Sequence, residues 1–160
     1  MIILGIDPGT TSIGYAILEC SSKPHLAVAD LFTIRGVSTQ ERLKELYLGI
    51  QILVKRWRPD AVALERLFFA KNAKTALAVS EARGATLLTT ALAGLRVYEY
   101  TPLEIKKTVT GDGRADKLQI KKMVGIILPQ TAGLRARDDV FDAIAIALTY
   151  YYKDANRKPR

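Results

Sequence analysis

The chain of 160 residues contains only one cysteine and one histidine. Cys20 therefore has no partner for a disulfide within the chain, which suits a reducing compartment. The same scarcity nearly excludes a zinc site built from histidine and cysteine. No apolar run of about eighteen residues is free of charge, and the N-terminus lacks the basic start and cleavage site of a signal peptide. We therefore expect a cytoplasmic protein that does not bind membranes.

Acidic residues are fewer than basic ones, 16 against 24, which leaves a net charge of +8. This excess favours a polyanionic partner, and nucleic acid over a membrane surface, although charge alone also fits an ordinary basic protein. The length and a hydrophobic content of 49% predict one domain over residues 1–152 with a polar, basic tail at 153–160. Basic residues cluster at 55–58, 71–83, 106–107, 114–122 and 153–160.

The hydrophobic pattern predicts five strands, at residues 2–6, 12–18, 27–34, 61–65 and 97–100. A helix separates the third strand from the fourth, starting after Ser38 with Glu41 completing a capping box. Further helices are expected over 72–92, 102–109, 116–128 and 138–152. Three strands followed by alternating helices and strands predict an α/β fold with a mixed five-stranded sheet flanked by helices.

Acidic residues stand where apolar segments end or begin. Asp7 closes the first strand, Glu65 closes the fourth, and Asp139 and Asp142 lie at the start of the last helix. If the first and fourth strands are parallel neighbours, Asp7 and Glu65 converge at the edge where open α/β sheets place their sites. Asp139 and Asp142 share one helix face, but Asp138 can share a face with Asp142, so the spacing leaves the choice between Asp138 and Asp139 open.

Each acid alone has an ordinary explanation as a turn former, a strand-end residue or a helix cap. Together they predict a metal site, because buried carboxylates need a positive partner and nothing basic lies next to Asp7 in the sequence. Carboxylate oxygens select Mg²⁺, with Mn²⁺ as a substitute. Two such ions can clamp a scissile phosphate, so phosphodiester hydrolysis within a basic surround is the predicted chemistry.

Five segments resemble the RuvC family of bacterial Holliday-junction resolvases, in the same order and with nearly the same spacing. They are residues 3–9 (ILGIDPG), 63–68 (ALERLF), 70–73 (AKNA), 82–84 (ARG) and 142–147 (DAIAIA). The resemblance implies a ribonuclease-H-like fold, a homodimer, and Mg²⁺-dependent symmetric nicking of four-way DNA junctions during recombination and repair. It also implies a branch-migration motor as a partner.

By the same resemblance, Asp7, Glu65, Asp139 and Asp142 match the metal-binding acids of the family. Phe68 matches an aromatic residue used against bases near the crossover, and the adjacent Phe69 is a second aromatic at that point. The match also assigns basic residues that approach the cleaved strand, Lys106 and Lys117. An exposed ring in such a loop can stack on an unpaired base, whereas a core position for either ring and solvated helix faces for the lysines stay open. Further candidates for DNA backbone contacts are Lys71, Lys74 and Arg83.

Small residues in the helix 72–92 allow close packing, either between two subunits or against the sheet. These residues are Ala76, Ala78, Ala82 and Ala85. Two other functions remain open from the sequence. The segment around Asp7 also resembles the phosphate loop of actin-like ATPases and sugar kinases, and a junction-binding protein without catalysis would have the same basic surface.

Overall fold

A computed structural model describes residues 1–9, 11–66, 73–134 and 136–155 of the chain. Five strands form one sheet in the order β3-β2-β1-β4-β5. β1 pairs antiparallel with β2 and parallel with β4, and β4 pairs parallel with β5. The predicted mixed sheet is therefore confirmed. The strands are β1 (Ile2–Asp7), β2 (Ser12–Cys20), β3 (Pro24–Thr33), β4 (Ala61–Glu65) and β5 (Val97–Tyr100).

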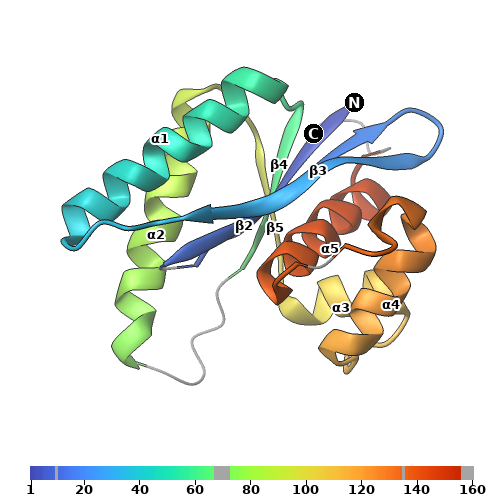
Figure 1. Cartoon of the computed structure of the whole chain (residues 1–160). Coiled ribbons are helices and arrows are strands. Elements are labelled where there is room, and N and C mark those ends of the chain that lie inside the picture. The colour runs from blue at the N-terminus through green and yellow to red at the C-terminus, as the bar shows by residue number, and fades with distance from the viewer. Residues whose placement is uncertain (10, 67–72, 135, 156–160) are drawn as a thin grey trace.

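Helices cover both faces of the sheet (Figure 1). On one face lie α1 (Thr39–Trp57) and α2 (Ala73–Leu92), and on the other lie α3 (Pro102–Thr110), α4 (Lys117–Ile127) and α5 (Asp138–Lys153). A short 3₁₀ turn (Pro129–Thr131) follows α4. Two apolar cores result, one between α1, α2 and the sheet and one around α5, which is buried along most of its length.

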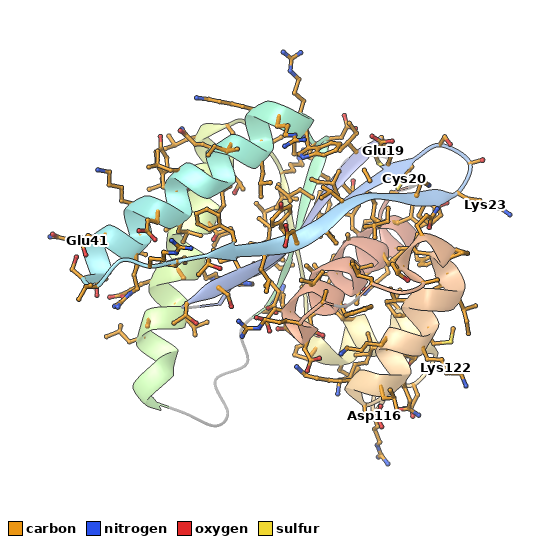
Figure 2. All side chains as sticks on the ribbon, in the orientation of Figure 1. Glu19, Cys20, Lys23, Glu41, Asp116 and Lys122 are labelled. Carbon is orange, nitrogen blue, oxygen red and sulfur yellow. The ribbon has the colours of Figure 1, made fainter. Side chains whose placement is uncertain are left out.

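Side-chain caps start the helices where the sequence predicts them. Ser38 and Glu41 form the capping box of α1, in which the Ser38 hydroxyl accepts from the Glu41 amide and the Glu41 carboxylate accepts from the Ser38 amide. Asp116 caps α4 by accepting a hydrogen bond from the Gln119 amide. These bonds satisfy amides that have no partner within the first turn of a helix. Asp116 and α4 lie at the lower right of Figure 2.

Several boundaries differ by a residue or more from the sequence prediction, most of all where β2 ends and β3 begins. β2 continues to Cys20 and β3 begins at Pro24, because these two residues close a hairpin, with a register shift between Ile17 and Leu18. α5 includes Lys153, whose Nζ lies 2.6 Å from Glu104 Oε1. Polar residues such as Glu19, His25 and Lys153 interrupt the apolar pattern there, so apolar periodicity alone does not predict these extensions. Within the described part of the chain, no helix is both long and apolar enough to cross a membrane.

Candidate active site

The ends of β1 and β4 bring two carboxylates to the same edge of the sheet. In the parallel pairing of these strands, Ile6 lies opposite Leu64. The next residues are Asp7 and Glu65, the last residues of their strands. Because neighbouring strands lie about 4.8 Å apart, the two side chains start from adjacent positions. The prediction that the first and fourth strands are parallel neighbours is therefore confirmed.

Glycines on β1 and β2 let α5 approach this edge closely. A Cβ on Gly14 would lie only 2.0 Å from the carbonyl oxygen of Asp139, and a Cβ on Gly5 would lie 2.3 Å from that of Ala143. Any side chain at these positions would push the helix away. Gly14 is also the register partner of Asp7 in the β1–β2 pairing. The first turn of α5 consequently packs over the strand position beside Asp7.

Asp139 is held at this edge by β2. The Ser12 hydroxyl donates a hydrogen bond to Asp139 Oδ2 at 3.0 Å, and Arg137 Nη2 lies 3.8 Å from the same oxygen. Ser12 is buried at the first position of β2. Asp142 lies almost one turn further along α5, and its Oδ2 is 3.5 Å from Lys117 Nζ. Four carboxylates thus come from three elements, β1, β4 and α5.

Asp138 is directed toward α4 by two lysines. Its Oδ1 lies 2.6 Å from Lys121 Nζ, and its Oδ2 lies 3.3 Å from Lys117 Nζ. These two lysines, Lys121 first, lower the pKa of Asp138 below its ordinary value. The sequence left open which of Asp138 and Asp139 belongs with Asp7. The hydrogen bond from Ser12 and the packing over Gly14 favour Asp139.

Burial and neighbouring charges raise the pKa values of Asp7, Glu65 and Asp142. Burial is the main cause for Asp7, and the charges of Glu65, Asp142 and Asp139 add to it, so that the pKa of Asp7 rises from 3.8 to about 7. Burial and the charge of Asp142 also raise the pKa of Glu65, against the influence of Lys117. Burial raises the pKa of Asp142 as well, again opposed by Lys117. Such a group of partly buried carboxylates that repel one another is stabilised by a cation.

The donor chemistry of this cluster fits a divalent metal ion. Carboxylate oxygens are the hard ligands that Mg²⁺ and Mn²⁺ prefer, and the raised pKa of Asp7 marks a carboxylate that a cation would stabilise. Among the residues that the structure describes, no three Asp, Glu, His or Cys side chains already surround one point as metal ligands.

Two predicted lysines face the acidic edge. Lys117 starts α4 and lies against Asp142, and its charge lowers the pKa of both Asp7 and Glu65. Lys106, on α3, also lowers the pKa of Glu65. Both amines are therefore within electrostatic range of the carboxylates, where they can meet an incoming phosphate.

The other predicted DNA contacts are placed differently. Arg83, on α2, forms an ion pair with Glu99 of β5, with its Nε 3.1 Å from Glu99 Oε1. This pair ties α2 to the sheet and favours a structural role for Arg83. Lys74 belongs to α2, but its side chain lies outside the described part of the structure. Also outside the described residues are Phe68, Phe69 and Lys71.

Reading the sequence did not identify Ser12 as part of this site. Serine at the start of a strand is common, and 127 positions separate Ser12 from Asp139. Glycine within the strands was the available signal, because Gly5 and Gly14 mark places where another backbone approaches closely. It points to the packing of α5 but not to the hydrogen bond.

The fold is that of the ribonuclease-H-like class, in which a mixed five-stranded sheet is flanked by helices. A family model described as crossover junction endodeoxyribonuclease RuvC matches residues 3–150. The chain belongs to the RuvC family. It is 46% identical over 155 residues to the RuvC of Chloroflexus aurantiacus, covering 95% of this chain and 93% of that protein. Identity to the RuvC of Moorella thermoacetica is also 46% over 155 residues, covering 94% and 90% of the two chains.

Solved structures agree with this assignment. RuvC of Thermus thermophilus is 32% identical, with a TM-score of 0.83 over 95% of this chain and 94% of that one. The same protein in complex with a Holliday junction substrate gives a TM-score of 0.85 at 32% identity, covering 95% and 93%. The yeast mitochondrial Holliday junction resolvase Ydc2 shares the fold, with a TM-score of 0.73 at 14% identity over 92% and 76% of the chains.

Proposed function

We propose that this chain resolves four-way DNA junctions by hydrolysing one phosphodiester in each of two opposed strands, at a Mg²⁺ site formed by Asp7, Glu65, Asp139 and Asp142. The observation that carries the proposal is the grouping of partly buried carboxylates at the ends of β1 and β4 and the start of α5, where burial and the neighbouring charges raise the pKa of Asp7 to about 7. Membership of the RuvC family supports the same chemistry.

Asp7, Glu65, Asp139 and Asp142 would hold a pair of Mg²⁺ ions, for which Mn²⁺ could substitute, and these ions would supply an activated water and stabilise the leaving oxygen. The protein contributes the hard ligands and a basic rim. Lys106 and Lys117 are the residues we propose for contacts with the cleaved strand, because both act electrostatically on Glu65. An amine beside a scissile phosphate stabilises the charge that develops during hydrolysis.

Junction DNA as the substrate is supported by relatedness and by charge. A relative with 32% identity has been solved with a Holliday junction substrate, and the net charge of +8 favours a polyanion. We further propose that Phe68 stacks on a base near the crossover and that Lys71 and Lys74 contact the DNA backbone. The RuvC-like segments at 63–68 and 70–73 support these assignments.

A homodimer suits this reaction, because a junction offers two equivalent strands and each site cuts one. An exposed apolar stripe along α2 supports it. Leu77, Leu88 and Leu92 are 69%, 61% and 72% exposed, and Gly84 is exposed between them. These positions share one helix face. Of the small residues first considered for such packing, Ala82 is buried against the sheet, so the stripe is the better candidate for contact with a second subunit.

Two further parts of the proposal rest on family membership alone. We propose that the nuclease works with a branch-migration motor, which would move the crossover to a cleavable position, and that it acts in the cytoplasm. A pull-down of the intact chain with the purified motor on junction DNA tests the first. If the same amount of the chain is recovered with and without the motor, the proposed partnership is contradicted.

A labelled mobile four-way junction and a plain duplex of the same sequence test the main proposal. In Mg²⁺, we expect paired nicks at symmetric positions in two opposed strands of the junction and no cleavage of the duplex. Addition of a chelator should abolish the nicks. Equal cleavage of both substrates would show a nuclease without junction selectivity. Tight ATP binding or junction binding without nicks would favour the kinase-like or the non-catalytic alternative.

A further inference from the structure

Asp138 is an acid that the proposed metal site does not use. It occupies the first turn of α5, next to Asp139, but its carboxylate is divided between two lysines of α4. Oδ1 meets Lys121 at 2.6 Å and Oδ2 meets Lys117 at 3.3 Å. Each oxygen thus has its own cationic partner, and Asp138 links the start of α5 to α4.

The geometry of α4 explains why one carboxylate reaches both lysines. Lys117 and Lys121 are four residues apart and so lie on one face of the helix. The Asp116 cap fixes the first turn, from which Lys117 projects. Lys121 also makes a cation–π contact with Phe141 on α5, with its Nζ 5.1 Å from the ring centre. Lys121 and Asp138 together therefore make a fixed support beside the more exposed Lys117.

Lys117 in turn joins this support to the acidic edge. Its Nζ lies between Asp138 Oδ2, at 3.3 Å, and Asp142 Oδ2, at 3.5 Å. Its partial burial alone would lower its pKa, but the charges and hydrogen bonds of Asp142 and Asp138 outweigh this effect and raise it. A continuous chain of alternating charge therefore runs from Asp142 through Lys117 and Asp138 to Lys121.

We propose that Asp138 is a positioning residue that holds Lys117 beside the scissile phosphate, an inference that rests on the nuclease function proposed above. A lysine side chain is long and flexible, and fixing it in one position costs rotamer entropy. Asp142 belongs to the proposed ligand set and shares its charge with that site. Asp138 lies outside the set, so it can hold Lys117 throughout the reaction.

The inference predicts a separation between cleavage rate and DNA affinity. Asp138→Asn removes the charge that attracts Lys117, and because these pairs are partly exposed we expect single-turnover nicking to slow by about three- to tenfold. Junction affinity should stay unchanged or become tighter, because a negative charge near the DNA is removed. A general folding defect would weaken binding and cleavage together. Asp138→Glu, which keeps the charge, should restore most of the rate.

Epistasis with Lys117 gives the decisive test. If Asp138 acts through this lysine, the double variant Asp138→Asn/Lys117→Ala should cut no more slowly than Lys117→Ala alone. Glu19→Gln is the matched control, since it makes the same charge change on an exposed residue at the other end of the sheet, paired with Ile2 rather than beside Asp7. Figure 2 shows Glu19 far from Asp116 and the start of α4. The control should nick at the wild-type rate.

Three results would overturn the inference: an unchanged rate for Asp138→Asn, an equal slowing by Glu19→Gln, or additive losses in the double variant. If Lys117→Ala itself cuts at the wild-type rate, the proposed role of Lys117 in the reaction fails as well. A slow Lys117→Ala with a normal Asp138→Asn would leave the nuclease proposal intact and remove only the positioning role.

Discussion

The carbonyl oxygen of Asp139 occupies the space that a side chain on Gly14 would need, 2.0 Å from the position of a Cβ. Gly14 pairs with Asp7 across the β1–β2 ladder. One glycine therefore sets the distance between the first turn of α5 and the end of β1. Because Gly14 has no side chain, α5 can bring its carboxylates close to Asp7.

Gly14→Ala should lower nicking strongly while the protein still folds. The added methyl meets backbone and cannot be avoided by a side-chain rotation, so α5 must shift. We expect a loss of about 1–3 kcal/mol in the free energy of unfolding, typical of overpacking. Because misplacement of reacting groups by about 1 Å can cost 10²-fold, single-turnover nicking should fall by about that factor.

Gly125→Ala is the matched control for this change. Gly125 lies in α4, and the nearest atom to its added Cβ is Thr131 Oγ1 at 3.9 Å, an ordinary contact. This variant should be as stable as wild type or more stable by up to about 1 kcal/mol, with normal cleavage. Equal behaviour of the two variants would contradict the role given to Gly14.

The raised pKa of Asp7 predicts a pH-dependent stability when divalent ions are removed. The folded pKa of about 7 exceeds the ordinary value of 3.8, so the unfolded chain ionises first and folding becomes less favourable between these two pH values. Above pH 7 the full cost, of the order of 4 kcal/mol, is present. Asp7→Asn should therefore stabilise the metal-free protein more at pH 8 than at pH 5, by about 2–3 kcal/mol.

Denaturant unfolding in a chelator at the two pH values measures this difference. The comparison of two pH values cancels effects of the asparagine that do not depend on charge. An equal gain at pH 5 and pH 8 would mean that the charge of Asp7 is not the source of the cost.

Divalent ions should remove the destabilisation that ionised Asp7 causes in the metal-free protein. Mg²⁺ or Mn²⁺ should raise the melting temperature of the wild type at pH 8, because ions that bind only the folded state stabilise it. Ser12→Ala should need about ten times more metal for the same shift, since the hydroxyl that orients Asp139 is lost. Ser12→Thr keeps the hydroxyl and serves as the control. An identical metal dependence for Ser12→Ala and wild type would exclude this orienting role.

The α2 stripe predicts a specific effect on association. Leu88→Glu places a charge in the middle of the exposed apolar face and should shift a dimer toward monomer in analytical ultracentrifugation. Ile126→Glu changes an equally exposed residue of α4, 62% exposed against 61%, and should leave the dimer intact. Dissociation of both variants, or of neither, would argue against α2 as the subunit contact.

The sequence predicts the centre of the sheet well because β1 and β4 are short apolar runs that each end in an acid. Asp7 and Glu65 could be placed together from strand order alone, since parallel neighbours end at one edge. The choice between Asp138 and Asp139 could not, because both fit helical spacing with Asp142. This choice depends on tertiary partners, because Ser12 holds Asp139 and Lys121 holds Asp138.

The DNA-contact predictions show the same limit. The family resemblance assigned Lys117 to the cleaved strand, and Arg83 was a further candidate for DNA contact, yet the first faces the carboxylates and the second pairs with Glu99. Charge along the chain identifies a basic region, but only the fold decides which amines face a partner and which are neutralised within the protein.

Nicking and junction binding by Asp7→Asn, measured on the same preparation, test the central assignment most directly. We expect junction affinity within about twofold of wild type, because phosphate contacts remain, together with a loss of about 10³-fold or more in Mg²⁺-dependent nicking. Cleavage within a few-fold of the wild-type rate would show that the partly buried carboxylate at the end of the first strand is not part of the catalytic site.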